Sequence, residues 1–184
     1  DSLYYNNTNN NTAIGGQSGA YTTGADNTYL GFKAGFGAAG ADANNVGVGS
    51  NALLAITIGV ENVCIGKDAG DSITTANQTV LIGTDAGQAI TVTQGSNLSD
   101  GTVAIGLNAL KYCTTGHGNL AVGANALTQH TTGSRNIAIG YGAMNQTGQD
   151  DSPTSTDNVF IGYDAGGGAW DDGADGTDDS NFNV

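Results

Sequence analysis

The stretch Asn11-Thr12-Ala13-Ile14-Gly15-Gly16-Gln17-Ser18-Gly19 decides the fold, because variants of it return along the whole sequence. Its signature is an aliphatic residue followed by a glycine, with a small residue three positions after that glycine. Successive copies are 16 to 23 residues apart, most often 17. The repeat glycines are Gly15, Gly31, Gly49, Gly66, Gly83, Gly106, Gly123, Gly140 and Gly162. A recurring period of this length is typical of a solenoid or another repeat architecture.

The residues before each repeat glycine follow the two-residue periodicity of a β-strand. Aliphatic or β-branched residues stand one and three positions before the glycine, as Ile65 and Val63 do before Gly66. Both side chains therefore lie on one face, and we expect that face to fill the core. Asn usually stands four positions before the glycine, where it marks the corner before the strand and can form a ladder of stacked amides. The glycine ends the strand, because positive φ or close backbone approach favours glycine.

The residues after each repeat glycine predict a narrow interior. The third is Ala in every repeat but the first, and much of the remainder is Gly, Asn and Thr, which are weak helix formers. The sequence therefore predicts an all-β fold, a parallel β-solenoid of about nine rungs of roughly 17 residues, with two short strands per rung. We expect an N-terminal arm over 1–10, the solenoid over 11–166, and an acidic tail or docking arm over 167–184.

The residue two positions before each repeat glycine is never charged and never an amide. By strand alternation it faces away from the aliphatic pair, so we expect it on the outer side of the coil. A strand that is apolar on both faces is typical of burial on both faces, which predicts a lateral homo-oligomer, most simply a trimer about an axis parallel to the rod. The alternative is a surface that tolerates small residues. The residues of this column are Ala13, Tyr29, Gly47, Cys64, Leu81, Ala104, Ala121, Ala138 and Phe160.

The composition limits the partners of this chain. It has 17 acidic and 4 basic residues and a formal net charge of −13, which argues against a nucleic-acid partner. No segment approaches the ~20 apolar residues of a membrane-spanning helix, so we expect no membrane insertion. The few Lys and Arg among many Asn, Thr and Gly residues favour an extracellular, cell-surface or virion-surface location. No signal peptide begins at Asp1, so we expect a mature form or a fragment.

The pentapeptides Asn-Thr-Ala-Ile-Gly (11–15), Asn-Leu-Ala-Val-Gly (119–123) and Asn-Ile-Ala-Ile-Gly (136–140) resemble those of known repeat proteins. They are similar to the head repeats of YadA-type trimeric autotransporter adhesins and to the Asn-Thr-Ala-Ile-Gly arrays of phage tail fibres. The resemblance covers about residues 11–166 and implies a left-handed parallel β-roll that assembles as a trimer in an adhesive or fibrous surface element. The period here is longer than in the adhesin heads, and Asn replaces the Ser common at the start of their strands.

Few residues suggest a catalytic or metal-binding site. The acidic segment near the C-terminus has closely spaced carboxylates separated by glycine, which is typical either of a calcium loop or of a plain acidic tail, and it lacks the twelve-residue spacing of an EF-hand. These carboxylates are Asp171, Asp172, Asp175, Asp178 and Asp179. His117 and His130 have no further ligand at metal-binding spacing, and Cys64 and Cys113 are expected to be buried as small apolar residues. We therefore expect no enzymatic activity and no cofactor other than calcium.

Three functions remain open from the sequence. The first is a structural subunit of an extracellular fibre or an adhesin head that self-associates laterally and end to end. The second is a module of a phage tail fibre that binds a host-surface glycan or receptor through side loops and the aromatics Tyr21, Tyr29, Phe32 and Phe36. The third is ice binding through recurring Thr-Thr pairs, which strand alternation disfavours because neighbouring residues point to opposite faces.

Overall fold

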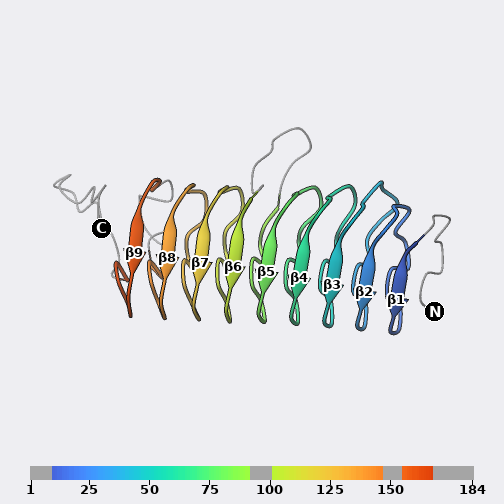
Figure 1. Cartoon of the computed structure of the whole chain (residues 1–184), viewed down its shortest axis with the longest axis horizontal. Coiled ribbons are helices and arrows are strands. Elements are labelled where there is room, and N and C mark those ends of the chain that lie inside the picture. The colour runs from blue at the N-terminus through green and yellow to red at the C-terminus, as the bar shows by residue number, and fades with distance from the viewer. Residues whose placement is uncertain (1–9, 92–100, 147–154, 168–184) are drawn as a thin grey trace.

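The computed structural model of the chain describes residues 10–91, 101–146 and 155–167. In these residues every repeat contributes one three-residue strand, and no helix is present. The strands are β1 (Thr12–Ile14), β2 (Thr28–Leu30), β3 (Val46–Val48), β4 (Val63–Ile65), β5 (Val80–Ile82), β6 (Val103–Ile105), β7 (Leu120–Val122), β8 (Ile137–Ile139) and β9 (Val159–Ile161). They form one parallel sheet in sequence order, which confirms the predicted all-β parallel solenoid (Figure 1).

The repeats stack in register because each strand pairs with its equivalent in the next repeat. Val63 pairs with Val80 and Ile65 with Ile82, and the same correspondence holds from β1 to β9. The amide of Val63 donates to the carbonyl of Thr79 at 2.8 Å, and the amide of Gly83 donates to the carbonyl of Ile65 at 2.7 Å. At a strand spacing of about 4.8 Å, nine strands give a rod about 40 Å long.

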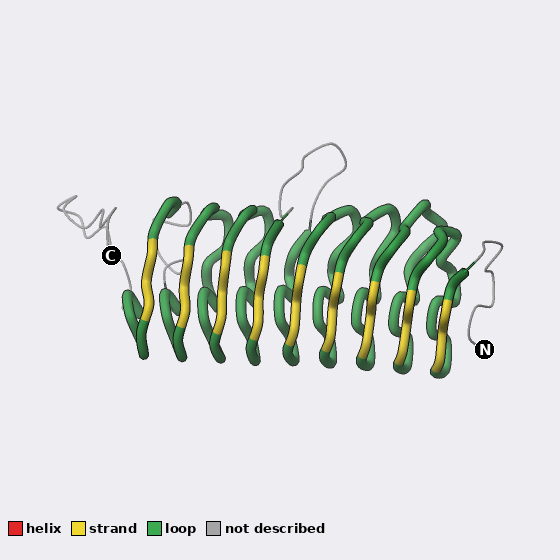
Figure 2. Tube along the Cα trace, in the orientation of Figure 1, coloured by secondary structure: helices red, strands yellow, loops and turns green. Residues whose placement is uncertain are grey.

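The second strand expected in each rung is absent from the described residues. Figure 2 shows strands along one wall of the coil and loops along the rest. The prediction was wrong because the segment after the repeat glycine alternates right- and left-handed backbone, as in Asn51 with φ 58° and Leu53 with φ 55°. This backbone turns instead of extending, although it still bonds to the next rung, as the amide of Gly35 does to the carbonyl of Ala52 at 2.8 Å.

No helix among the described residues has the length and apolar character needed to cross a membrane. The longer intervals between β5 and β6 and between β8 and β9 contain residues 92–100 and 147–154, which lie outside the described residues. Across each interval the strands still pair in register, β5 with β6 and β8 with β9.

Candidate interaction surfaces

The inward and outward faces of the strands are the reverse of those expected from the sequence. The middle residue of each strand points into the coil: it is fully buried in β2 to β8, nearly so in β9 and half-buried in β1. The predicted lateral interface is thus wrong, since its residues are part of the chain's own core. They are Ala13, Tyr29, Gly47, Cys64, Leu81, Ala104, Ala121, Ala138 and Phe160.

The narrow interior explains this reversal. Strand alternation places the middle residue opposite to its two neighbours but does not say which side is inside. The facing wall already fills the interior with residues such as Ala69 and Ile73, both fully buried, so space remains for one inward side chain per strand. The bulkier aliphatic pair must therefore point away from the coil.

A signal for the inward column exists in the sequence and lies in side-chain volume. In every repeat after the first, a larger middle residue occurs with glycine four positions after the repeat glycine, as in Leu81 with Gly87 and Phe160 with Gly166. A Gly or Ala in the middle occurs instead with Leu or Met, as in Ala104 with Leu110. Added β-carbons on Gly87 and Gly166 would lie 2.8 and 2.6 Å from Leu81 and Phe160 atoms, so both positions fill the same space.

The outward side chains form a continuous aliphatic surface, which we call the strand face. It carries two side chains from each strand and contains no charged residue and no amide. Ile14 is 61 % exposed, Ile65 37 % and Ile161 67 %, whereas most of the others are half-buried by their neighbours along the column. The strand face consists of Thr12, Ile14, Thr28, Leu30, Val46, Val48, Val63, Ile65, Val80, Ile82, Val103, Ile105, Leu120, Val122, Ile137, Ile139, Val159 and Ile161.

The repeat glycines at the ends of the strands bring successive rungs close together. Each has φ between 130° and 142°, a region that L-residues rarely adopt. A β-carbon on Gly15 would lie 2.5 Å from the carbonyl oxygen of Gly31, and the same clash recurs in each repeat up to Gly140. Gly162 is different, because among the described residues a β-carbon there would meet only Ala165, at 3.8 Å.

A ladder of buried asparagines stabilises the corner before the strands. The Oδ1 atom of Asn45 accepts hydrogen bonds from the backbone amide and the Nδ2 atom of Asn62, both at 3.0 Å. Asn62 Nδ2 also donates to the carbonyl of Ala76 at 2.8 Å, so one side chain joins two rungs and closes its own turn. The ladder runs through Asn27, Asn45 and Asn62, and again through Asn119, Asn136 and Asn158.

Thr79 and Thr102 interrupt this ladder between its two halves. The hydroxyl of Thr79 donates to Asn62 Oδ1 at 2.8 Å and ends the first half. The buried hydroxyl of Thr102 has no hydrogen-bond partner in the part of the chain that the structure describes. The two threonines therefore occupy equivalent positions with opposite hydrogen-bonding states.

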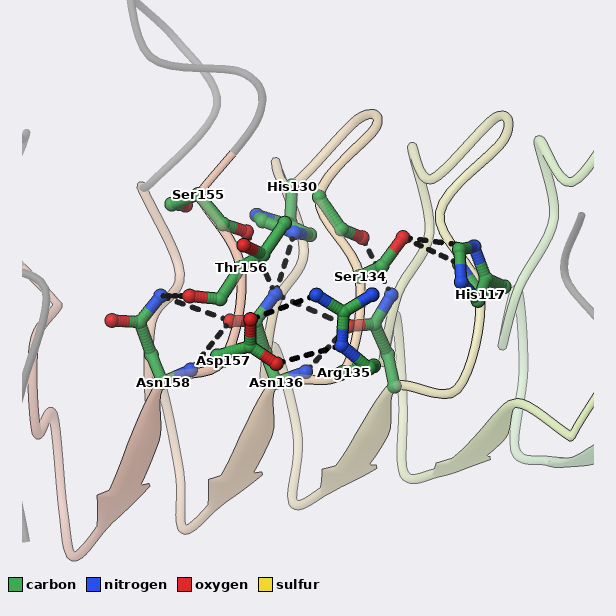
Figure 3. A network of polar contacts seen from close by, with 11 residues as sticks. His117, His130, Ser134, Arg135, Asn136, Ser155, Thr156, Asp157 and Asn158 are labelled. Carbon is green, nitrogen blue, oxygen red and sulfur yellow. Dashed lines mark hydrogen bonds and ion pairs between the residues drawn. The ribbon is translucent and has the colours of Figure 1, made fainter.

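His130 lies in the coil beside the second half of the ladder (Figure 3). It occupies the position held by Ile56, Ile73 and Ile90 in other repeats and is fully buried. Its Nε2 atom lies 3.1 Å from Asn136 Nδ2, which requires Nε2 to be the unprotonated, accepting nitrogen. Burial lowers the pKa of His130 to about 4. The ring is thus a neutral part of the core, whereas His117 contacts Ser134 at 3.0 Å and takes no part in this contact with Asn136.

A buried carboxylate supports the core near the other end of the rod. Asp42 accepts hydrogen bonds from the Thr22 hydroxyl at 2.6 Å and the Tyr29 hydroxyl at 2.8 Å. Burial raises the pKa of Asp42, and burial together with the nearby Asp42 charge raises the pKa of Tyr29. This cluster lets a tyrosine replace the smaller inward residues of other repeats. Tyr29 is therefore unsuited to contact a glycan, which corrects the expectation from the sequence.

The other expected chemical groups do not come together as a reactive site. The carboxylates of the expected calcium loop, Asp171, Asp172, Asp175, Asp178 and Asp179, lie outside the described residues. Within residues 10–91, 101–146 and 155–167, no group of His, Cys, Asp and Glu side chains could hold a metal ion. Cys64 and Cys113 are free and buried, as predicted, and burial raises the pKa of Cys113 to about 12 and that of Cys64 further.

Comparison with known proteins assigns no function to this chain, so its function has to be argued from its surfaces. No family model matches this sequence, and no curated protein or solved structure matches it either.

Proposed function

We propose that this chain is a non-enzymatic structural subunit of an extracellular fibre or an adhesin head, and that its copies associate side by side through the strand face. The simplest assembly is a homotrimer in which three strand faces turn toward an axis parallel to the rods. A cell-surface or virion-surface location fits the low Lys and Arg content already described. The lateral interface of this proposal differs from the one expected from the sequence, because the inward column cannot reach another copy.

The observation that carries the proposal is the exposed aliphatic strand face. An unbroken column of Val, Ile and Leu side chains in contact with water is unfavourable, at roughly 25 cal/mol for each Å² of apolar surface. The face is about 40 Å long and about 10 Å wide, given the spacing of strands and the rise per residue. Exposed apolar patches beyond a few hundred Å² are typical of interaction sites.

The composition of the strand face supports association with copies of the same chain. The face repeats along the rod and contains only Thr12 and Thr28 as polar residues. None of the acidic residues that give the chain its charge of −13 belongs to the strand face, so copies can meet there without apposing carboxylates of that face. A partner with the same spacing of about 4.8 Å between side chains matches the face along its whole length.

The test is an aspartate in the middle of the strand face. We expect the unmodified chain to have about three times the mass of its 18.3 kDa subunit in sedimentation equilibrium, or a whole multiple of that trimer mass. Ile65→Asp should weaken the trimer by at least about 100-fold, because an unpaired buried charge costs about 3–5 kcal/mol. Asn125→Asp is the matched control, since it adds the same charge at an outward corner where Asp68 and Asp85 stand in other repeats.

The outcomes separate the parts of the proposal. A monomeric wild type with a water-exposed strand face would overturn lateral association. A dimer that Ile65→Asp dissociates would keep the interface and overturn the trimer. Equal assembly of Ile65→Asp and Asn125→Asp would place the contact on another surface.

A further inference from the structure

The strand edges at the two ends of the rod differ in their residues but are complementary to each other. β1 and β9 are the outermost strands of the described sheet and lie at opposite ends of the rod (Figure 1). We call residues 10–19 the β1 end and residues 155–167 the β9 end. In each strand pair, the first strand residue donates its amide to the carbonyl of the residue just before the next strand, as Ile137 does to Asn158 at 2.8 Å. The equivalent group of Val159 points past β9, where a further rung would stack.

One buried atom at the β9 end lacks the hydrogen bonds that its equivalents accept in the asparagine ladder. The Oδ1 atom of Asn158 is buried and has no hydrogen-bond partner among the described residues. The same atom of Asn136 accepts from the backbone amide of Asn158 at 3.1 Å and from its Nδ2 at 3.0 Å. Figure 3 shows Asn158 Oδ1 directed away from Asn136, toward the end of the rod. By this pattern, an asparagine one rung further on would supply the missing donors.

We propose that the β9 end binds the β1 end of a second copy of this chain, head to tail, so that the sheet and the asparagine ladder continue from one subunit into the next. In this joint the first asparagine of the incoming copy, Asn11, stacks on Asn158. Asn11 Nδ2 already donates to the carbonyl of Gly24 at 2.8 Å. This is the bond to its own turn that Asn62 also makes while it donates to the preceding rung. The amide orientation of Asn11 thus matches that of an inner asparagine.

The side chains at the two ends are complementary in volume. The inward column ends in the large Phe160 and begins with the small Ala13, which repeats the large–small succession from Tyr29 to Gly47 inside the rod. At the β9 end, Tyr163 stands one position after the repeat glycine and is 80 % exposed. The first repeat has Gly16 at that position and is the only repeat with glycine there, so it leaves room for the Tyr163 ring.

The charges of the two ends are also compatible. The β9 end presents Asp157 and Asp164 in the two outward columns, and the β1 end presents the neutral amides Asn10 and Gln17 in the same columns. Asn10 Nδ2 donates to Asp26 Oδ1 at 2.9 Å, which is the pairing of amide with acid that the joint would repeat. A β9 end that met another β9 end would instead appose carboxylates, which favours head-to-tail polarity.

This joint extends the proposed fibre role by adding growth along the rod, and it uses surfaces separate from the strand face. A contact between two different ends does not close on itself, so each added subunit presents a new β9 end. Lateral association sets the mass per unit length, whereas the end joint sets the length. The two proposals can therefore fail independently.

Gly162→Ala tests the joint. Of the residues that the structure describes, a β-carbon on Gly162 meets only Ala165. In the joint it would lie against the carbonyl of Gly15 of the next copy, as a β-carbon on Gly15 would lie 2.5 Å from the carbonyl oxygen of Gly31. We expect electron micrographs and sedimentation velocity of the full wild-type chain to show rods in multiples of one subunit length, longer at higher protein and salt concentration. Gly162→Ala should give single-length rods with an unchanged mass per length.

A mixing experiment tests the polarity. The Gly162→Ala subunit keeps a normal β1 end, so it can add to a wild-type β9 end and then blocks further addition. A small fraction of this variant should shorten wild-type rods. Tyr163→Asp serves as a second variant if Gly162→Ala does not fold, because Tyr163 is exposed in the subunit, and it should also shorten the rods.

Wild-type rods of one length at every concentration would overturn the proposal. So would rods that stay equally long in Gly162→Ala or Tyr163→Asp, since another surface would then join the subunits. Rods that keep their mass per length in Ile65→Asp would contradict the lateral interface and leave the end joint standing.

Discussion

The side chain of Leu81 fills the space that a β-carbon on Gly87 would require, since that atom would lie 2.8 Å from Leu81 Cδ1. Ala104 and Leu110, the equivalent residues of the next repeat, divide the same space in the opposite way. The core of each rung is thus a fixed volume shared between one inward strand residue and one residue of the facing turn. This relationship makes the two positions interdependent.

A double-mutant cycle measures that interdependence. Leu81→Ala should lower the free energy of unfolding by about 2–5 kcal/mol through the cavity it leaves. Gly87→Leu should lower it by about 1–3 kcal/mol through overpacking, although Leu110 shows that leucine adopts the required φ of 52°. The double variant reproduces the arrangement of the next repeat, so we expect it to regain most of both losses in urea unfolding. Additive losses would mean that the two side chains do not share one space.

The period, the strand positions and the asparagine ladder could all be predicted from the sequence, because each rests on residues that recur at one phase. Alternation could not predict which face of each strand points into the coil. Val63 and Ile65 share a face whether that face is inside or outside. The pairing of Leu81 with Gly87 contains the missing information, because only residues that share a cavity need complementary volumes. The expected second strand failed for a related reason: Leu53 and Leu110 look like strand residues but have left-handed backbone.

A residue that departs from the repeating type in its column was harder to interpret from the sequence than the column itself. His130 stands where Ile56 and Ile73 stand in other repeats, and only the structure shows that Asn136 provides its hydrogen bond. The strand face was identified as an apolar column but assigned to the core. The candidate lateral surface is therefore present in the sequence pattern, and its location required the coordinates.

The close approach of successive rungs predicts unequal costs for two glycine substitutions. Gly66→Ala places a β-carbon against the carbonyl of Gly83 at φ 137°, so it must separate two rungs or distort the strand end. The β-carbon of Gly101→Ala meets none of the described residues within 4 Å, at φ 70°. We expect about 1–2 kcal/mol for the left-handed backbone at Gly101 and a distinctly larger loss at Gly66, measured by thermal unfolding. Similar melting temperatures for the two variants would contradict the rung clash.

The two threonines that interrupt the ladder predict effects of opposite sign. Thr79→Val removes a hydroxyl that donates to Asn62, so the free energy of unfolding should fall by about 1 kcal/mol. Thr102→Val removes a buried hydroxyl without a partner, and the stability should stay the same or rise by about 1 kcal/mol. Urea midpoints at equal m-values give the comparison. A loss at Thr102 as large as that at Thr79 would mean that the Thr102 hydroxyl has a partner, such as a bound water.

The neutral state of His130 predicts a loss of stability in acid. Its pKa is lowered from 6.5 to about 4 in the folded chain, because burial disfavours the charged ring. Between these two values the unfolded chain binds more protons, so the contribution of His130 is complete above about pH 6.5 and is lost as the pH falls toward 4. The full difference is about 3 kcal/mol, at 1.36 kcal/mol for each unit of pKa.

The pH dependence belongs to His130 if an apolar replacement removes it. His130→Ile introduces the residue found at Ile56, Ile73 and Ile90, and it leaves the Asn136 amide its bonds to Asn119 and to the Ser155 carbonyl at 2.9 Å. We expect the difference in unfolding free energy between wild type and His130→Ile to change by about 3 kcal/mol between pH 7 and pH 4. A wild-type profile parallel to that of His130→Ile would show that the buried ring titrates as it does in the unfolded chain.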